Sequence, residues 1–152
     1  MQIDLTPSTD ATLYALFAEV RAEELAMDGW EPALRDLVLR QQFDARRRGY
    51  RAQYPQAREY EILAGSVPAG WGVIDRVAPV WCLVDIAVTR QWRRRGIAAT
   101  IVRRWQDEAA TARCGMRLSV LIANAPARAL YERLGFRAID QSETHVQMEW
   151  PS

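Results

Sequence analysis

The sequence predicts one compact domain of the α+β class, in which helices and strands are mixed along the chain. The chain has 152 residues, a length that suits a single domain. Hydrophobic residues make up 49% of it, which is enough for a core and too many for a disordered chain. Apolar spacings of helical and strand period follow one another in the order β-α-α-β-β-β-α-β-α-β-β.

The first half of the chain is predicted to be mainly helical, after a short strand over residues 2–5. Candidate N-caps at 8–10 and a break at Gly29 bound a first helix, and Pro32 and Pro55 bound a second. The stripe of the first helix consists of Leu13, Leu16, Phe17, Val20 and Met27. The expected inward face of the second consists of Leu34, Leu37, Val38, Gln41 and Ala45.

Strand patterns follow. Residues 60–64 and 71–75 flank a turn rich in Gly and Pro and predict a hairpin. Residues 80–89 form a nearly continuous apolar run, which is typical of a strand buried on both faces. Asp85 interrupts this run. Three later strands are expected over residues 117–122, 136–139 and 144–150.

Two further helices separate these strands. Residues 96–112 predict a helix with a core face of Ile97, Ile101, Trp105, Ala109 and Ala112. On its solvent face we expect the i,i+4 pairs Arg103–Asp107 and Arg104–Glu108. Asn124 suits the N-cap of a short helix, and Gly135 suits its end.

Composition limits the function classes. The net charge of +1 argues against a non-specific nucleic-acid binder, which would be clearly basic. All 20 basic residues are Arg, a bias expected of a GC-rich bacterial source, and the lack of Lys excludes a Walker-type phosphate loop. The first residues do not resemble a signal peptide, and no apolar run could span a bilayer. We therefore expect a cytoplasmic protein without a membrane partner.

The stretch QWRRRGIA, residues 91–98, follows the buried strand and begins a helix. A helix N-terminus offers unpaired N–H groups and the positive end of a dipole, which suit a phosphate or pyrophosphate. Gly96 lets a ligand approach the backbone, Ala98 is nearly as small, and Arg93 and Arg95 add positive charge. The plainer alternative is a solvated arginine run. A third is a nucleic-acid surface shared with Trp92 and residues 46–48, for which nothing shows the required coplanarity.

The sequence VDIAVTRQWRRRGIAATIV resembles the acetyl-CoA motif of the GNAT superfamily of N-acetyltransferases. The family's pattern is Gln or Arg, two residues, Gly, one residue, then Gly or Ala. Arg93, Gly96 and Ala98 occupy its fixed positions. Downstream, NAPARALYERLGF at residues 124–136 resembles the family's second signature. The resemblance runs from about residue 61 to residue 150.

This resemblance implies a GNAT-like fold. Its central twisted, mostly antiparallel sheet would have about six to seven strands with a V-shaped split, flanked by about four helices. It implies a single N-acetyltransferase domain over residues 1–152, in which 1–58 form a helical acceptor-side portion and 59–150 the acetyl-CoA-binding core. Acetyl-CoA would be the co-substrate and an amine the acceptor, and homodimers are frequent in the family.

Acetyl-CoA would lie in the split, between the strand that ends at Val88 and the strand 117–122. The backbone at Ala87 and Val88 would align the thioester, and the N–H groups of residues 94–99 would hold the pyrophosphate. The full cofactor-binding set implied by the resemblance is Ala87, Val88, Arg93, Arg94, Arg95, Gly96, Ile97, Ala98, Ala99, Asn124, Ala127 and Tyr131.

Tyr131 is the first catalytic candidate. Its spacing from Asn124 and Ala127 places all three on one helix face. A neutral tyrosine, with a pKa of about 10, can donate a hydrogen bond or proton to a leaving thiolate, whose pKa is about 8.5. The family's matching Tyr often has this general-acid role. The alternative is that Tyr131 only packs against the cofactor.

Asp85 is the second catalytic candidate, because a carboxylate inside an apolar strand is costly unless it is paired. It would bind the acceptor's ammonium or relay a proton through water. The equally weighted alternative is a structural hydrogen bond or an arginine partner. With an ordinary pKa of about 3.9 it would be a weak base, so charge recognition is the safer role.

Other candidates are weaker. Glu23, Glu24 and Trp30 lie on the expected acceptor side, together with Asp85, and the two acids would favour a cationic acceptor. A solvated helix face and core packing are the plainer readings. His145 is the only histidine and gives no metal site. Cys82 and Cys114 form no disulfide framework and suit core positions better than nucleophilic ones.

Three functions remain after these observations. The first is an N-acetyltransferase in which an amine attacks acetyl-CoA directly in a ternary complex. The second is a non-catalytic acyl-CoA sensor or interaction module. The third is a nucleic-acid-binding domain, which the charge balance disfavours. The sequence leaves the acceptor, the acyl chain and the oligomeric state open.

Overall fold

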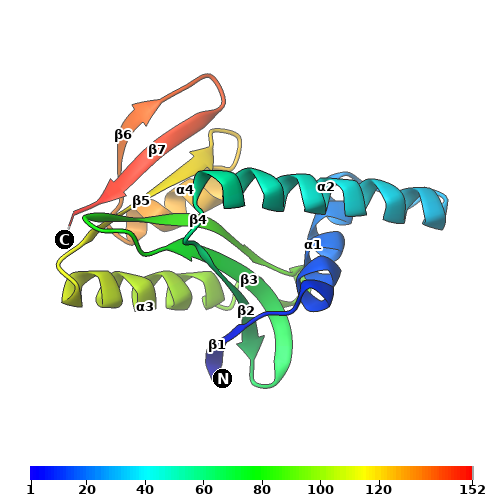
Figure 1. Cartoon of the computed structure of the whole chain (residues 1–152), viewed down its shortest axis with the longest axis horizontal. Helices are drawn as coiled ribbons and strands as arrows, with labels where there is room; N and C mark the ends of the chain where they lie inside the picture. Colours follow the sequence, from blue (N-terminus) through cyan, green and yellow to red (C-terminus); the bar gives the residue numbers. More distant parts are fainter. Residues whose placement is uncertain (152) are drawn as a thin grey trace.

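The computed structural model describes residues 1–151. Within them the helices and strands follow the order expected from the sequence, with one short 3-10 helix added (Figure 1). The elements are β1 (Ile3–Pro7), α1 (Asp10–Glu24), α2 (Pro32–Gln53), β2 (Arg58–Ala64), β3 (Val67–Asp75), β4 (Val80–Val88), η1 (Arg90–Trp92), α3 (Ile97–Thr111), β5 (Gly115–Leu121), α4 (Ala125–Arg133), β6 (Arg137–Gln141) and β7 (His145–Trp150). The mixed α+β class is confirmed.

The strands of residues 1–151 form one seven-stranded sheet in the order β1-β2-β3-β4-β5-β7-β6. All neighbours are antiparallel except β4 and β5, which are parallel. These two strands pair only from Val80–Gly115 to Leu83–Leu118. Beyond that point β4 continues to Val88 and β5 to Leu121 without pairing to each other. We call this opening the split.

A β-bulge lies where the split begins. Val73 of β3 is opposite Asp85, whereas Ile74 is opposite Leu83, so Val84 is the extra residue. A bulge bends its strand and increases the local twist. The bend therefore turns the end of β4 away from β5 and places Asp85 beside the split.

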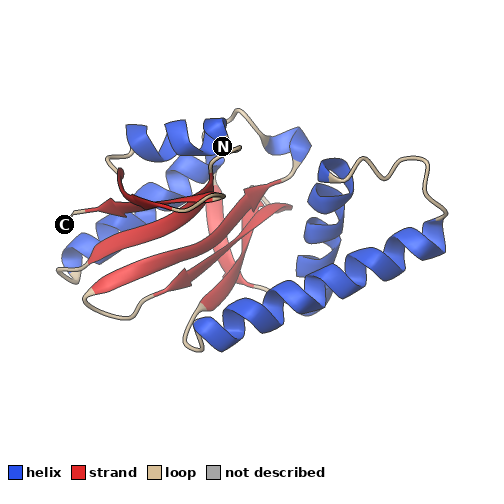
Figure 2. Ribbon diagram, turned by 90° about the horizontal axis from the view of Figure 1, so that it is seen from above, coloured by secondary structure: helices blue, strands red, loops and turns tan. Residues whose placement is uncertain are grey.

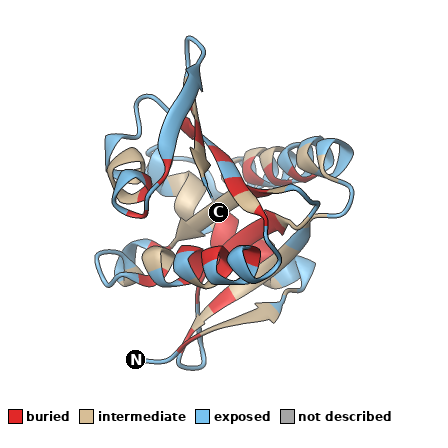
Figure 3. Cartoon of the chain, turned by 90° about the vertical axis from the view of Figure 1, so that its left-hand side faces the viewer, coloured by how far each residue is buried: buried red, intermediate tan, exposed pale blue. Residues whose placement is uncertain are grey.

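Helices cover both faces of the sheet, with α1 and α2 together on the right in Figure 2. Two buried clusters separate the layers. The cluster on the α3 face includes the fully buried ring of Trp105, which lies so close to Gly72 that an added Cβ would meet it at 2.6 Å. The cluster under α1 and α2 consists of Leu13, Leu16, Phe17, Phe43, Trp71 and Val73. Figure 3 shows buried positions gathered on the sheet and on the inner sides of the helices.

The prediction of which face of α2 is buried is wrong. Leu34 and Leu37 are 49% and 55% exposed, and the buried residues are Leu39, Phe43 and Arg47. Both sets have helical spacing, so periodicity does not choose between them. The helix turns its Phe43 side inward because that ring packs against aromatic rings of α1 and because Arg47 finds carboxylates there.

The expected ion pairs along α3 are also wrong, because neither is among the ion pairs of residues 1–151. Arg104 instead donates to the carbonyl of Ile3 at 2.7 Å, and Glu108 pairs with Arg76 at 3.2 Å. An i,i+4 pair on a helix contributes only about 0.2–0.5 kcal/mol, so partners from other elements displace it easily. Ala112, expected in the core, is exposed because α3 ends at Thr111.

Of the helices described, none is long and apolar enough to traverse a bilayer.

Candidate active site

The turn before α3 has the backbone of an anion site. Arg94 and Gly96 have positive φ angles of 63° and 74°, and the first helical bond runs from the Thr100 N–H to the Gly96 carbonyl at 3.0 Å. Within residues 1–151, no backbone acceptor is recorded for the N–H groups of residues 94–99. A Cβ added at Gly96 would meet no atom within 4 Å, so the space above the turn is open. These donors fit a phosphate or pyrophosphate.

The arginines of this turn have separate roles. Arg93 donates from Nε to the Val88 carbonyl at 2.9 Å and forms an ion pair with Glu23 of α1. Its backbone N–H donates to Arg90. The guanidinium of Arg95 lies 5.0 Å above the ring of Trp92. Arg93 therefore fastens the turn to β4 and α1, and its side chain is not turned outward as a free phosphate ligand.

The end of β4 presents backbone groups to the split. The Thr89 N–H donates to the Ala69 carbonyl of β3 at 2.9 Å. Because successive residues of a strand direct their backbone groups to opposite edges, the Val88 N–H points away from β3 and into the split. The same alternation directs the Ala87 backbone toward β3. There β3 approaches so closely that a Cβ on Gly70 would lie 2.1 Å from the Ala87 carbonyl.

Tyr131 has a buried and protonated phenol. Its side chain is buried on α4 and packs edge-on against Phe136, with ring centroids 5.8 Å apart. Its hydroxyl makes no hydrogen bond with another residue of the described chain. Burial and, to a smaller extent, the negative charge of Asp85 together raise the pKa of Tyr131 to about 12. Tyr131 is thus neutral at physiological pH and has a free hydroxyl.

Helix α4 begins and ends as its sequence predicts. The Asn124 side chain accepts the Ala127 N–H at 3.2 Å and caps the helix. Gly135, with a φ of 94°, follows its end. Ala127 and Tyr131 pack against the same core cluster, on the α3 side of the sheet.

Asp85 has both partners named in its structural alternative, a hydrogen bond and an arginine. One carboxylate oxygen lies 2.7 Å from Nη2 of Arg46 on α2, and the other accepts Nε1–H of Trp71 at 2.8 Å. The Asp85 side chain is 13% exposed. Each oxygen of the carboxylate therefore has a donor from another element of the fold. Arg46 is distant in sequence, so sequence reasoning did not identify it as the partner.

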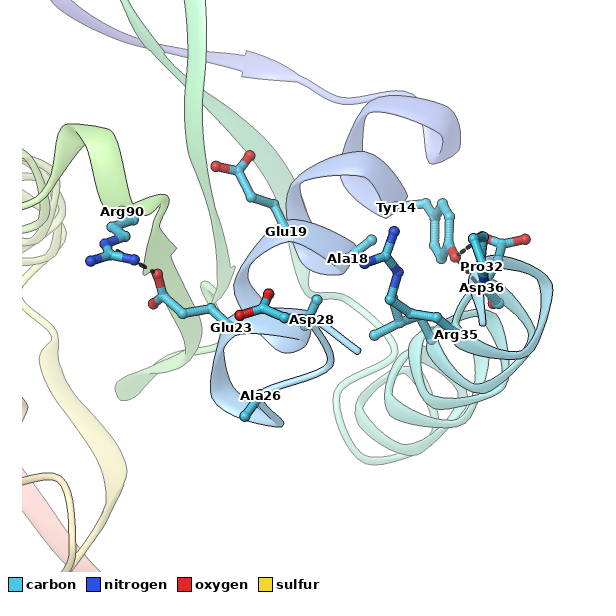
Figure 4. A pocket seen from close by; sticks show the side chains of 12 residues that line it. Tyr14, Ala18, Glu19, Glu23, Ala26, Asp28, Pro32, Arg35, Asp36 and Arg90 are labelled. Carbon is cyan, nitrogen blue, oxygen red and sulfur yellow. Dashed lines mark hydrogen bonds and ion pairs between the residues drawn. The ribbon is translucent and has the colours of Figure 1, made fainter. Parts of the chain in front are cut away.

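The expected acceptor residues do not gather around Asp85. Glu23 pairs with Arg90 at 3.8 Å and with Arg93, and it lines a separate hollow of about 620 Å³ between α1 and α2 (Figure 4). Glu24 is exposed and lies 3.7 Å from Arg21, and Trp30 is 40% exposed. Neither lines this hollow. The sequence predicted one acceptor site for these residues and Asp85. In the structure they lie at the end of α1 and in the turn after it, away from the residues that line the split.

A second hollow, of about 380 Å³, opens at the split itself, and we call it the split cavity. Six of the residues that line it are Arg46, Tyr50, Asp85, Arg117, Ser119 and Gln147. Sequence reasoning missed Arg117, Ser119 and Gln147. The signal was present in the alternation of β5, whose residues 116, 118 and 120 are buried while 117 and 119 are exposed on the opposite face.

The Arg46–Arg48 run does not form a basic surface. Arg46 is paired with Asp85, and Arg47 is buried between Asp10, at 2.9 Å, and Glu59, at 3.2 Å. Two of its three arginines are therefore bound internally. This geometry gives no support to the nucleic-acid alternative.

Within residues 1–151, no group of three or more His, Cys, Asp or Glu side chains is placed to hold a metal ion. Cys82 and Cys114 are buried free thiols, and burial raises the pKa of Cys82. A buried thiol with a raised pKa is a poor nucleophile.

Comparison with known proteins decides the family. Residues 19–136 match the acetyltransferase (GNAT) family. The chain belongs to this family. GNAT acetyltransferases are acyltransferases, so the chain is an enzyme of that class. No curated protein sequence matches the chain.

Solved structures share the fold at low identity. The PaiA N-acetyltransferase of Thermoplasma acidophilum, in complex with coenzyme A, has a TM-score of 0.75 and 16% identity, covering 100% of both chains. A Bacillus subtilis acetyltransferase in complex with CoA has a TM-score of 0.67 and 17% identity, over 99% of this chain and 98% of that one. The ribosomal-protein-S18-alanine N-acetyltransferase of Escherichia coli has a TM-score of 0.67 and 19% identity, over 99% and 94%. The GNAT-like fold is confirmed.

Proposed function

We propose that this GNAT enzyme moves an acetyl group from acetyl-CoA to a primary amine by direct attack in a ternary complex. The observation that carries the proposal is the separation of β4 from β5 after Leu83–Leu118, followed along the chain by the free N–H groups of residues 94–99. Two of the structural neighbours were solved with coenzyme A, which supports the same ligand here.

Different residues bind different parts of acetyl-CoA in this proposal. The N–H groups of residues 94–99 hold the pyrophosphate, with Ala98 and Ala99 small enough to allow its approach. Asn124 and Ala127 line the pantetheine arm. Of the two backbone positions expected to align the thioester, Val88 supplies the donor that polarises the acetyl carbonyl, because its N–H points into the split.

The bond changes take place at the carbonyl carbon of the acetyl group. The amine nitrogen attacks the carbonyl carbon, the N–C bond forms, the C–S bond breaks, and coenzyme A leaves as a thiolate. The pKa of Tyr131, about 12, lies above that of a thiol, about 8.5. Tyr131 therefore stabilises the sulfur mainly by donating a hydrogen bond. The proton released from the amine passes to water in the split cavity.

In this proposal Asp85 is a positioning residue. Its carboxylate holds Arg46 on one side and Trp71 on the other. Its charge also raises the pKa of Tyr131 and so keeps the hydrogen-bond donor protonated.

The test is the initial rate of coenzyme A release with amines of several classes, measured while both substrates are varied. A ternary complex predicts amine-dependent release with intersecting double-reciprocal lines. Parallel lines would show an acyl-enzyme and would contradict direct attack. Tight acetyl-CoA binding without release on any amine would support the non-catalytic sensor instead.

A further inference from the structure

The charges of the split cavity specify the acceptor more closely than the family does. The cavity, of about 380 Å³, is large enough for a small molecule. The second half of α2 borders it on one side, and β4, β5 and β7 border it on the other. Because Leu83 and Leu118 line it, the cavity reaches the point where β4 and β5 separate. A molecule in it therefore has access to the thioester.

Arg117 is the arginine of this cavity that forms no ion pair within residues 1–151. The other lining arginine, Arg46, is neutralised by Asp85 at 2.7 Å. Within residues 1–151, no carboxylate lies within 4.0 Å of the Arg117 guanidinium nitrogens. Its cross-strand neighbour Glu149 is on the same face of the sheet but forms no ion pair with it, and it lines a different hollow with Arg137. Arg117 thus offers an unpaired guanidinium to whatever occupies the cavity.

The rest of the lining suits a polar ligand and offers no second cation site. Ser119 accepts a hydrogen bond from Gln147 at 2.9 Å, and both are neutral. Asp85 is the cavity's one lining carboxylate in the described chain, and its oxygens are already occupied. A polyamine would find no free carboxylate here. A carboxylate would find Arg117, whose planar fork binds such a group through two hydrogen bonds.

We propose that the acceptor is a small amine that carries a carboxylate, such as an amino acid or a short peptide. Its carboxylate binds Arg117, and its amine lies at the split. Arg117 directly precedes Leu118, the last residue of β5 that pairs with β4, so one short molecule spans the two points. This assignment rests on the proposed function and replaces the cationic acceptor expected from Glu23 and Glu24.

The experiment compares acceptors that differ only in this charge. Coenzyme A release is measured with free amino acids and dipeptides and with their C-terminal amides. We expect kcat/KM to be about ten- to a hundredfold lower for each active acceptor's amide. Arg117→Gln should remove that difference, and Arg137→Gln, an exposed arginine outside the cavity, should preserve it. Calorimetric binding of the same pairs to the coenzyme A complex gives a readout independent of turnover.

The possible outcomes distinguish failure of this inference from failure of the proposed function. Amides or polyamines that react as well as the carboxylates would overturn the inference and leave the proposed function standing. The same holds if Arg117→Gln keeps the preference. If protein that binds acetyl-CoA acetylates no amine of either kind, the proposed function fails and the inference fails with it.

Discussion

At the scale of single residues, the proposed catalysis depends on the phenol of Tyr131, which is buried and has no internal partner. Replacing Tyr131 by Phe removes the hydroxyl and keeps the ring that packs against Phe136. We expect kcat to fall about a hundredfold, because one preorganised donor to a developing anion is lost. The affinity for acetyl-CoA, measured by calorimetry, should change by less than about twofold. Tyr60→Phe is the control, because its hydroxyl binds Arg76 elsewhere. Unchanged turnover in Tyr131→Phe would exclude its catalytic role.

The raised pKa of Tyr131 makes a second prediction at this scale. A raised value keeps the phenol protonated at every pH below about 12. The pH profile of kcat should therefore show no fall near pH 10, the ordinary pKa of tyrosine. In Asp85→Asn, loss of the nearby charge lowers the pKa of Tyr131, so any alkaline fall moves to lower pH. An alkaline limb that is the same in Asp85→Asn would contradict the electrostatic link.

At the scale of elements, the turn before α3 is expected to bind acetyl-CoA through its backbone. Gly96→Ala adds strain at a positive φ, of about 1 kcal/mol, and places a methyl group in the open space above the turn. Gly65→Ala is the matched control, because Gly65 has a similar φ of 64° and also meets no atom. We expect both variants to lose similar stability in denaturant unfolding. Only Gly96→Ala should weaken acetyl-CoA binding, by about tenfold, and equal binding in the two would contradict the site.

The orientation of α2 gives a stability prediction. Leu39 is 4% exposed and Leu37 is 55% exposed, although they are two residues apart on one helix. Leu39→Ala should lower the free energy of unfolding by about 2–4 kcal/mol, because it leaves a cavity in the core. Leu37→Ala should change it by less than about 0.5 kcal/mol. Similar losses in the two variants would mean that the other face of α2 is buried.

The same helix shows how far sequence reasoning reaches. Periodicity and caps predicted that α2 exists and where it starts, because these are local properties of the chain. They did not predict its buried face, because two stripes of helical spacing are present. The aliphatic one contains Leu34 and Leu37, and the one that is buried contains Arg47. Arginine is counted as a solvent residue until its carboxylate partners are known, and Asp10 and Glu59 come from distant segments.

At the scale of the whole molecule, the ion pairs of Arg47 with Asp10 and Glu59 link α2 to the start of α1 and to β2. Burial alone would raise the pKa of Glu59, but hydrogen bonds from Arg51 and Tyr50 and the charge of Arg47 hold it below its ordinary value of 4.5. A lowered pKa stabilises the fold above the ordinary value, and this stabilisation is lost as the pH falls through the lower folded value.

Glu59→Gln should therefore lower the free energy of unfolding by about 2 kcal/mol at pH 7, because it leaves Arg47 buried without full compensation. The difference from the native chain should shrink as the pH falls below the ordinary carboxyl value of 4.5. Chemical denaturation across this pH range measures it. Glu132→Gln removes an exposed pair with Arg128 and serves as control, with an expected loss below about 0.5 kcal/mol. A pH-independent difference for Glu59→Gln would contradict the linkage.

The site as a whole was only partly readable from the sequence. The turn at residues 94–99 and the Tyr131 helix carry local motifs, and both lie where the sequence indicated. The acceptor side has no such motif. Arg46 and Arg117 line one cavity because the second half of α2 and the start of β5 border the same space, and that arrangement depends on packing between distant segments.

The most direct test of the central claim is to follow the acetyl group itself. The protein is incubated with acetyl-CoA carrying a deuterated acetyl group and with amino acids and short peptides, and the products are weighed by mass spectrometry. The account predicts an amine product that gains the labelled acetyl group, in amounts that fall about a hundredfold with Tyr131→Phe. Absence of any labelled amine, from protein shown to bind acetyl-CoA, would contradict it.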